Sequence, residues 1–259
     1  MRIALGIEYD GRPFHGWQRQ KNADSVQAFV EAALSDVANE SIITHCAGRT
    51  DSGVHACEQV IHFDTTAERQ LHAWVLGVNT KLPREISVLW SKVVSDDFHA
   101  RFSAFERRYR YIIFNRKSRP GLLHKKVTWE YTPLDLGLMQ TAAESLVGEH
   151  DFSSFRALAC QAKSPIKTVK SLEVSQHGNY FYIDIEANAF LHHMVRNIAG
   201  VLMSIGRGDE SVSWCKEVLE KKDRTQGGKT AAPDGLYLVS VAYPEPFEIQ
   251  RNPVLPYFS

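Results

Sequence analysis

The stretch SIITHCAGRTDSGVHACEQVIHFD, residues 41–64, holds two apolar segments separated by a loop that contains two glycines. Residues 41–46 and 58–64 are rich in β-branched and other apolar side chains, which predicts a strand on each side of the loop. The loop, AGRTDSGVHA (47–56), carries one acid, Asp51, among small residues. We therefore expect a rigidly anchored loop at the centre of the N-terminal half.

Further elements surround this pair of strands in the order strand–helix–strand–strand–helix–strand, the ferredoxin-like arrangement. The outer strands contain many apolar side chains, and the helices carry apolar residues at helical spacing. Asp24 and Gln27 resemble a capping box at the start of the first helix. The outer elements are a strand at 2–9, a helix at 24–39, a helix at 67–78 and a strand at 86–94.

The C-terminal half predicts a related order after one linking strand, RRYRYIIFN (107–115). Thr132 is the expected cap of its first helix, with Pro133 in the first turn and Gly148 just past the end. The remaining elements are a strand at 127–131, a helix at 133–147, a hairpin of 167–176 and 179–187, helices at 190–205 and 212–222, and a strand at 236–243.

These orders predict an α+β fold of two ferredoxin-like halves, with antiparallel or mixed sheets around a central basic cleft. The N-terminal domain is expected at 1–104 and contains the Asp51 loop. The C-terminal domain is expected at 105–259 and contains the linking strand and a proline-containing C-terminal arm. A cleft between two such halves is a natural place for a functional site.

The distribution of charge, more than its total, indicates a polyanionic partner. The formal net charge is zero. Residues 101–126 nevertheless contain nine Lys and Arg against one acid, and residues 156–170 contain four basic residues and no acid. A segregated field of this kind can steer a polyanion to one face. The alternative is a solvated face balanced by nearby acids, and the sequence leaves it open.

Asp51 lies in a tripeptide, Asp-Ser-Gly, that is also common in plain turns, because Asp bonds its own backbone and Gly accepts positive φ. Gly48 and Gly53 would allow a ligand to approach the backbone closely. Arg49 would hold a nearby carboxylate ionised. An oriented carboxylate suits nucleophilic attack at a sugar anomeric carbon, although glycosidases normally need a second carboxyl group and none stands beside Asp51.

The linking strand places Tyr109 and Tyr111 on one face and Arg108 and Arg110 on the other. An aromatic side chain on a basic strand can stack on a base displaced from its helix. The alternative, equally compatible with the pattern, is that both tyrosines are ordinary core residues.

The segment NAFLHHMVRNIAGVL, residues 188–202, predicts an apolar helix in which Arg196 needs a carboxylate partner, with Asp51 as a candidate. His192 and His193 are adjacent on this helix and point about 100° apart, so we do not expect them to share a metal ion. We expect no metal site.

Composition excludes several other classes of protein. No apolar run approaches the roughly 20 residues that span a bilayer, so we expect no membrane association. The N-terminus lacks the pattern of a signal peptide. The four cysteines are scattered without C-x-x-C spacing, which favours free thiols in a reducing cytoplasm over zinc or disulfides.

Taken together, the motifs resemble the TruA family of tRNA pseudouridine synthases. They occur in order and cover nearly the whole chain. One departure is Cys57-Glu58, where a small or glycine-containing pair is expected. The matching motifs are IEYDGRPFHGWQRQ (7–20), AGRTDSGVHA (47–56), FHARFSAFERRYRYIIFN (98–115), GEHDFSSFR (148–156), NAFLHHMVRNIAG (188–200) and TAAPDGLYL (230–238).

The resemblance implies an isomerase that converts uridines 38, 39 and 40 of the tRNA anticodon stem-loop into pseudouridine, without cofactor or metal. It implies a cytoplasmic homodimer with two ferredoxin-like halves about a basic cleft. Asp51 falls on the catalytic nucleophile and Tyr109 on the tyrosine that stacks on the target uracil. Arg49 matches the arginine of the catalytic loop, and Arg196 the arginine that pairs with the aspartate. Substrate binding is assigned to Tyr109 and the strand arginines Arg107, Arg108 and Arg110.

Two rival functions remain. A non-catalytic RNA-binding protein could use a ferredoxin-like sheet with exposed aromatics, although no RNP1-like run is present. A nucleoside or glycoside hydrolase could use Asp51, although a second carboxylate is missing. The sequence also leaves open whether Asp51 attacks ribose C1′ or the uracil ring, which group removes the C5 proton, which tRNA position is preferred, and how a dimer is arranged.

Overall fold

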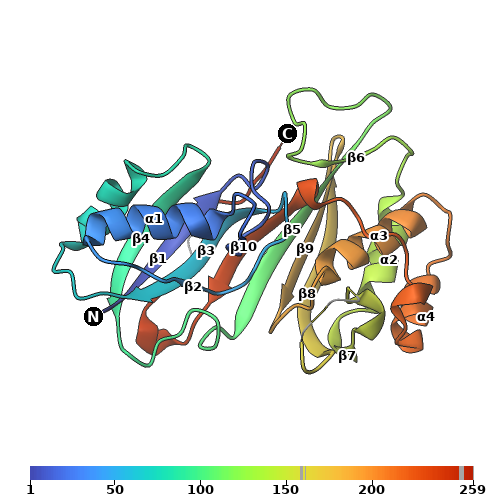
Figure 1. Ribbon diagram of the computed structural model, residues 1–259. Helices are drawn as coiled ribbons and strands as arrows, with labels where there is room; N and C mark the ends of the chain where they lie inside the picture. Colours follow the sequence, from blue (N-terminus) through green and yellow to red (C-terminus); the bar gives the residue numbers. More distant parts are fainter. Residues whose placement is uncertain (158–159, 161, 251–253, 259) are drawn as a thin grey trace. The chain divides into compact units, whose positions relative to one another are not determined.

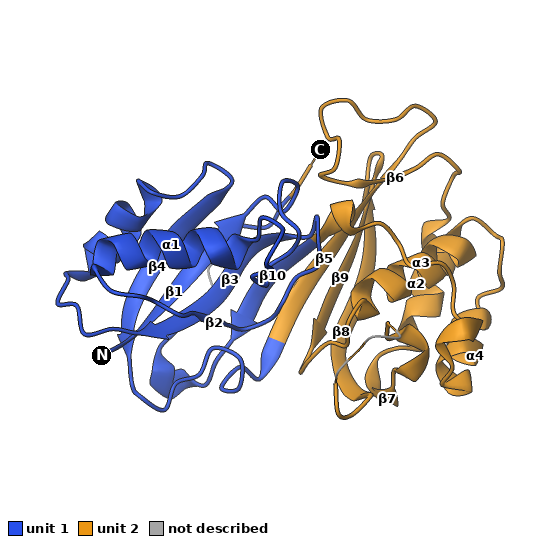
Figure 2. Cartoon of the chain, in the orientation of Figure 1, with its two compact units in different colours: residues 1–106, 237–256 blue, residues 107–236, 257–259 orange. Residues whose placement is uncertain are grey.

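The structure is a computed structural model that describes residues 1–157, 160, 162–250 and 254–258 (Figure 1). The chain divides into two compact units, coloured separately in Figure 2. Unit 1 comprises residues 1–106 and 237–256, and unit 2 comprises residues 107–236 and 257–259. Each unit contains its own strands and its own helical elements.

The strands of unit 1 are mostly antiparallel. In the order β4-β1-β3-β10, β1 pairs antiparallel with both β4 and β3, whereas β10 runs parallel to β3. The short β2 lies outside this linear order and pairs antiparallel with β3. The bounds are β1 (Arg2–Tyr9), β2 (His45–Cys46), β3 (His55–Asp64), β4 (Ile86–Val94) and β10 (Leu236–Ala242).

The strand predicted at 41–46 is wrong in length, because only its last two residues pair as β2. Side chains of the preceding helix accept hydrogen bonds from backbone N–H groups of the residues just before β2. The N–H of Ile42 donates to the Ser35 hydroxyl at 3.0 Å, and the N–H of Thr44 donates to the Glu31 carboxylate at 2.8 Å. These groups are therefore satisfied without a neighbouring strand.

The helices of unit 1 are α1 (Val26–Ala38) and the π-helical turn η1 (Ala73–Gly77). The predicted capping box is wrong, because the N-cap is Ser25 and it makes no side-chain cap bond. Gln27 instead donates to Glu31 within α1, at 2.9 Å. The helix predicted from residue 67 also starts later, since the N–H groups of residues 66 and 67 donate to the carboxylate of Glu40.

The strands of unit 2 follow the order β5-β9-β8-β7 with antiparallel pairing, and β6 lies parallel to β5. The predicted hairpin is confirmed as β8 and β9, and its turn contains Gly178 at φ 55°. The bounds are β5 (Glu106–Asn115), β6 (Thr128–Glu130), β7 (Gly148–Asp151), β8 (Ile166–His177) and β9 (Tyr180–Ala187).

The helices of unit 2 are α2 (Leu136–Glu144), α3 (Met194–Gly206) and α4 (Trp214–Lys221). The predicted Thr132 cap is wrong, because Asn115 donates to the Thr132 carbonyl and accepts from the N–H of Leu134, which holds this segment out of the helix. Asp135 caps α2 instead. Short 3-10 turns occur at η2 (Ser153–Phe155), η3 (Arg224–Gln226), η4 (Pro233–Gly235) and η5 (Glu245–Phe247).

The predicted α+β class is confirmed by these elements. The predicted domain bounds, 1–104 and 105–259, stay predictions. The contacts between residues place Tyr237–Pro256 in unit 1, with the N-terminal part of the chain. The cause is the parallel pairing of β10 with β3, in which Tyr237 lies opposite His55. No described helix has the length and apolar character needed to cross a bilayer.

Candidate active site

The loop that carries Asp51 is held at its start by hydrogen bonds to β3. The N–H of Ala47 donates to the Val60 carbonyl at 2.8 Å. The Gln59 side chain then binds both backbone groups of Gly48, donating to its carbonyl at 2.5 Å and accepting from its N–H at 3.3 Å. Gln59 is fully buried, so its amide reaches the partly exposed Gly48 from the interior of the unit.

The middle of the loop is fixed through Thr50. Its hydroxyl lies 2.7 Å from the hydroxyl of Tyr9, and its carbonyl accepts from the N–H of Trp17 at 3.1 Å. Gly16 adopts φ 86°, and a Cβ at this position would lie 2.7 Å from the Thr50 carbonyl oxygen. Only glycine therefore permits this approach of the N-terminal segment to the loop.

Asp51 itself begins a tight turn. The N–H of Val54 donates to the Asp51 carbonyl at 3.1 Å, and Gly53 has φ 80°. The Asp51 side chain is half-buried, whereas Arg49 is exposed. The turn predicted from Asp-Ser-Gly is thus present, and it holds the carboxylate on a backbone fixed on both sides. A carboxylate held in this way is suited to act as a nucleophile or a base.

A further polar contact involves His55, at the start of β3. His55 is buried, and its Nδ1 lies 3.3 Å from Oδ1 of Asp10. Its ring stacks on Tyr237 of β10 with 4.6 Å between centroids. Burial works to raise the pKa of Asp10, but hydrogen bonds with His55 and Arg12 outweigh it, so this pKa lies well below its usual range.

In unit 2, the two tyrosines of β5 have different surroundings. Tyr111 is a core residue, because it is fully buried and its hydroxyl donates to the Ala232 carbonyl at 2.8 Å. Burial is the main cause of the raised pKa of Tyr111. Tyr109 is 8% exposed, and its ring meets the edge of Phe190 with 4.9 Å between centroids. Tyr111 therefore follows the core alternative, and Tyr109 keeps an aromatic partner on the loop before α3.

The arginines of β5 are engaged by other groups of unit 2. Arg110 forms a two-point ion pair with Asp184 of β9, at 2.8 Å from Nη2 and 3.0 Å from Nε. Arg108 contacts the same carboxylate at 3.3 Å and Glu186 at 3.7 Å. Arg107 donates to the carbonyl of Asn188 at 2.9 Å. Strand β9 thus neutralises much of the charge that the sequence concentrates on β5.

Arg196 lies in the first turn of α3 and is half-buried. Its Nε donates to the Ala231 carbonyl at 2.9 Å, and its own carbonyl accepts from the N–H of Ala231 at 3.1 Å. Arg196 therefore ties α3 to the segment before η4. His193 precedes the helix at φ 63°, so the predicted start of the helix at residue 190 is wrong.

The structure thus places Asp51 and Arg49 together on one loop of unit 1, and Tyr109, the strand arginines and Arg196 in unit 2. Sequence reasoning missed three residues that position the loop: Tyr9, Thr50 and Gln59. Thr50 lies within the motif and Gln59 three residues after it; only Gln59, a polar residue inside the predicted strand 58–64, offered a signal. Tyr9 carried no such signal, since it fits an ordinary strand pattern.

Comparisons with known proteins match almost the whole chain. A family model described as tRNA pseudouridine synthase matches residues 6–103 and 142–244. A protein of Shewanella amazonensis called tRNA pseudouridine synthase A is 57% identical over 258 residues, covering 100% of this chain and 99% of its own. One of the same name from Coxiella burnetii (strain Dugway 5J108-111) is 54% identical over 257 residues, covering 99% of this chain and 98% of its own.

Among solved structures, one titled "Crystal Structure of a Cbf5-Nop10-Gar1 Complex" is 10% identical with a TM-score of 0.38. The match covers 91% of this chain and 48% of that chain. A likeness at this level supports no conclusion on the fold or the function.

Proposed function

Because this chain belongs to the tRNA pseudouridine synthase family, and is therefore an isomerase that acts on tRNA, we propose that it converts uridines 38, 39 and 40 of the anticodon stem-loop into pseudouridine. Identity along the full length supports the reaction. The motif resemblance supports the three positions. Two ferredoxin-like halves, a homodimer and a cytoplasmic location belong to the same proposal.

The observation that carries the proposal is the anchoring of the Asp51 loop. Backbone groups before Asp51 are bound by Val60, Gln59 and Trp17, the Thr50 hydroxyl is bound by Tyr9, and the Asp51 carbonyl accepts from the N–H of Val54. These partners are uncharged and mostly buried, so they hold the loop without supplying a second acid or base. A carboxylate oriented in advance needs little rearrangement to reach its transition state.

In the proposed reaction, the target uridine leaves the base stack and the Asp51 carboxylate attacks it. Attack at ribose C1′ forms an Asp51–C1′ bond, breaks the N1–C1′ bond and frees the uracil anion; attack on the uracil ring is the alternative. The base then rotates, C5 attacks C1′ and displaces the Asp51 carboxylate, and the C5 proton leaves while N1 gains one. No atom is lost in total, so the reaction consumes no co-reactant.

Other residues take supporting roles in this proposal. Tyr109 stacks on the target uracil, and its edge contact with Phe190 keeps its ring in a fixed orientation. Arg49 takes the role of the arginine of the catalytic loop, and Arg196 that of the arginine that the resemblance pairs with the aspartate. Arg107, Arg108 and Arg110 contribute positive potential to tRNA binding, with only those donors that Asn188, Asp184 and Glu186 leave available.

The decisive experiment replaces Asp51 by Asn and follows tritium release from tRNA labelled at uridine C5. We expect turnover to be abolished while the melting temperature and tRNA affinity stay close to wild type. Asp36→Asn is the matched control, because it makes the same chemical change at an exposed position of α1. Appreciable tritium release by Asp51→Asn would refute the nucleophile.

The same assay separates the rival functions. A non-catalytic RNA-binding protein would release no tritium even as wild type, and a hydrolase would release free uracil and leave an abasic site. Sedimentation analysis at several protein concentrations tests the homodimer, which requires a mass of twice one chain.

A further inference from the structure

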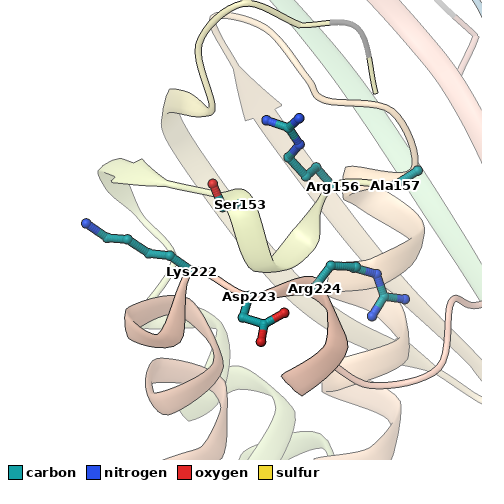
Figure 3. Close-up of a pocket in the computed structure, with 6 residues that line it drawn as sticks. All are labelled: Ser153, Arg156, Ala157, Lys222, Asp223 and Arg224. Carbon is teal, nitrogen blue, oxygen red and sulfur yellow. The ribbon is translucent and has the colours of Figure 1, made fainter. Parts of the chain in front are cut away.

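A pocket of about 300 Å³ opens in unit 2 between η2 and the turn that follows α4 (Figure 3). Three of its six lining side chains are cationic, and they come from two stretches of sequence about 66 residues apart. The lining residues are Ser153, Arg156, Ala157, Lys222, Asp223 and Arg224.

Hydrogen bonds hold the two sides of the pocket together. The N–H of Asp223 donates to the Ser154 hydroxyl at 2.9 Å, which joins the turn after α4 to η2. Asn197 of α3 donates to the Phe155 carbonyl at 2.7 Å and accepts from Arg224 at 3.1 Å. The pocket is therefore part of the folded structure of unit 2, and Asn197 of α3 joins its two sides.

The three cations keep donors available for a ligand. Among the described residues, the hydrogen bonds of Arg224 use only Nη2, toward Asn197 and Thr230. Within the described part of the chain, Arg156 makes one hydrogen bond, at 3.5 Å to the Cys160 carbonyl. Lys222 lies 3.9 Å from Asp151, beyond hydrogen-bond distance, and its side chain is 61% exposed.

The acids near the pocket do not cancel this charge. The Asp223 carboxylate accepts from both the N–H and the hydroxyl of Thr225, at 2.9 and 2.8 Å, so it caps η3. In Figure 3 it points away from Arg156. Asp151 offsets part of the charge of Lys222. The three cations outnumber these two acids, so an anion is the class of ligand that the pocket favours.

The arrangement of the cations distinguishes between kinds of anion. Figure 3 shows the side chains of Arg156, Lys222 and Arg224 pointing in different directions around the opening. Such an array does not enclose one small ion, but it suits a chain of phosphates that passes over it. The pocket also borders the loop before α3, because the N–H of Ala157 donates to the His192 carbonyl at 2.9 Å.

We propose that Arg156, Lys222 and Arg224 form a phosphate-binding site for the sugar-phosphate backbone of the tRNA. This inference rests on the proposed function, which makes tRNA the substrate. The site contacts phosphates only, so it contributes affinity and position and carries no sequence preference.

The test compares Lys222→Gln with Lys221→Gln, a neighbouring lysine that does not line the pocket. Binding of an unmodified tRNA transcript is measured over a series of KCl concentrations. We expect Lys222→Gln to lower the slope of log K against log salt by about 0.7–0.9, the value for one lost phosphate contact, and Lys221→Gln to leave it unchanged. The double variant Arg156→Gln with Lys222→Gln should lower the slope by about twice as much.

Equal slopes for Lys221→Gln and Lys222→Gln would overturn the inference, as would a double variant with the wild-type slope. Arg224 is left unchanged because its bonds to Asn197 and Thr230 give it a structural role. Tritium release at saturating tRNA is followed in parallel. If wild type releases none, the proposed function fails whatever the slopes are; equal slopes with normal release remove this inference alone.

Discussion

Two groups of cationic side chains in unit 2 differ in how strongly other groups of the protein already bind them. On β5, Arg110 and Arg108 share the Asp184 carboxylate, at 2.8 and 3.3 Å. At the pocket, the described residues leave Lys222 3.9 Å from the Asp151 carboxylate and give Arg156 one weak hydrogen bond. The sequence is more basic around β5, yet the pocket has more donors left for a ligand. Local density of charge therefore does not identify the cations that are available to bind tRNA.

The largest expected effect concerns stability. The side chains of Arg110 and Asp184 are 10% and 13% exposed, so removing one partner leaves a nearly buried charge. We expect Arg110→Ala to lower the free energy of unfolding by about 3 kcal/mol. Arg156→Ala should change it by no more than about 0.5 kcal/mol. Urea denaturation measures both, and equal losses would remove the difference between the two groups.

An intermediate effect is expected on tRNA binding. Arg108→Gln should lower the salt slope by less than half of the roughly 0.7–0.9 expected for Lys222→Gln, because Asp184 and Glu186 already neutralise Arg108. The same binding series measures it. A full loss for Arg108→Gln would mean that the acids of β9 release this arginine when tRNA binds.

The smallest effect is on the pKa of Asp151. Burial works to raise this pKa, but hydrogen bonds from Ser153 and the charges of Lys222 and Arg156 outweigh it and lower it. Lys222→Gln should therefore raise the pKa of Asp151 toward its usual value. Because the folded pKa is lowered, Asp151 contributes stability above about pH 4 that is lost as the pH falls, and the variant should lose part of it.

Titration of the Asp151 carboxyl carbon by NMR measures this shift directly. Lys216→Gln is a suitable control, since Lys216 is exposed on α4 and its acid partner is Glu220. An unchanged Asp151 pKa in Lys222→Gln would place the ammonium group too far from this carboxylate to affect it.

Much of the fold could be predicted because its strands have clear apolar patterns. The segments 2–9, 86–94 and 236–243 all form strands close to their predicted bounds. Two of the errors fall where side chains distant in sequence take the backbone groups of a segment. Glu31 binds Thr44 and shortens β2, and Asn115 delays the start of α2. Periodicity carries no information on such partners.

The candidate site and the pocket show the same contrast between residues that are contiguous in the sequence and residues that only the fold brings together. Asp51 could be proposed from the sequence because its glycines, arginine and flanking strands are contiguous there. Lys222 and Arg224 could not, because they lie far along the chain from Arg156 and follow the acids Glu217 and Glu220. Only the folded chain brings the three cations to one pocket.

The position of β10 has a consequence for biosynthesis. Unit 1 needs Tyr237–Pro256, which the ribosome makes only after the whole of residues 107–236. Unit 2 is thus nearly complete in the nascent chain while β3 still lacks its parallel neighbour, and His55 gains its stacking partner only after residues 107–236 have been translated. This pairing of β3 is therefore completed only after unit 2 has been made, so a chain that stops before Tyr237 would lack it.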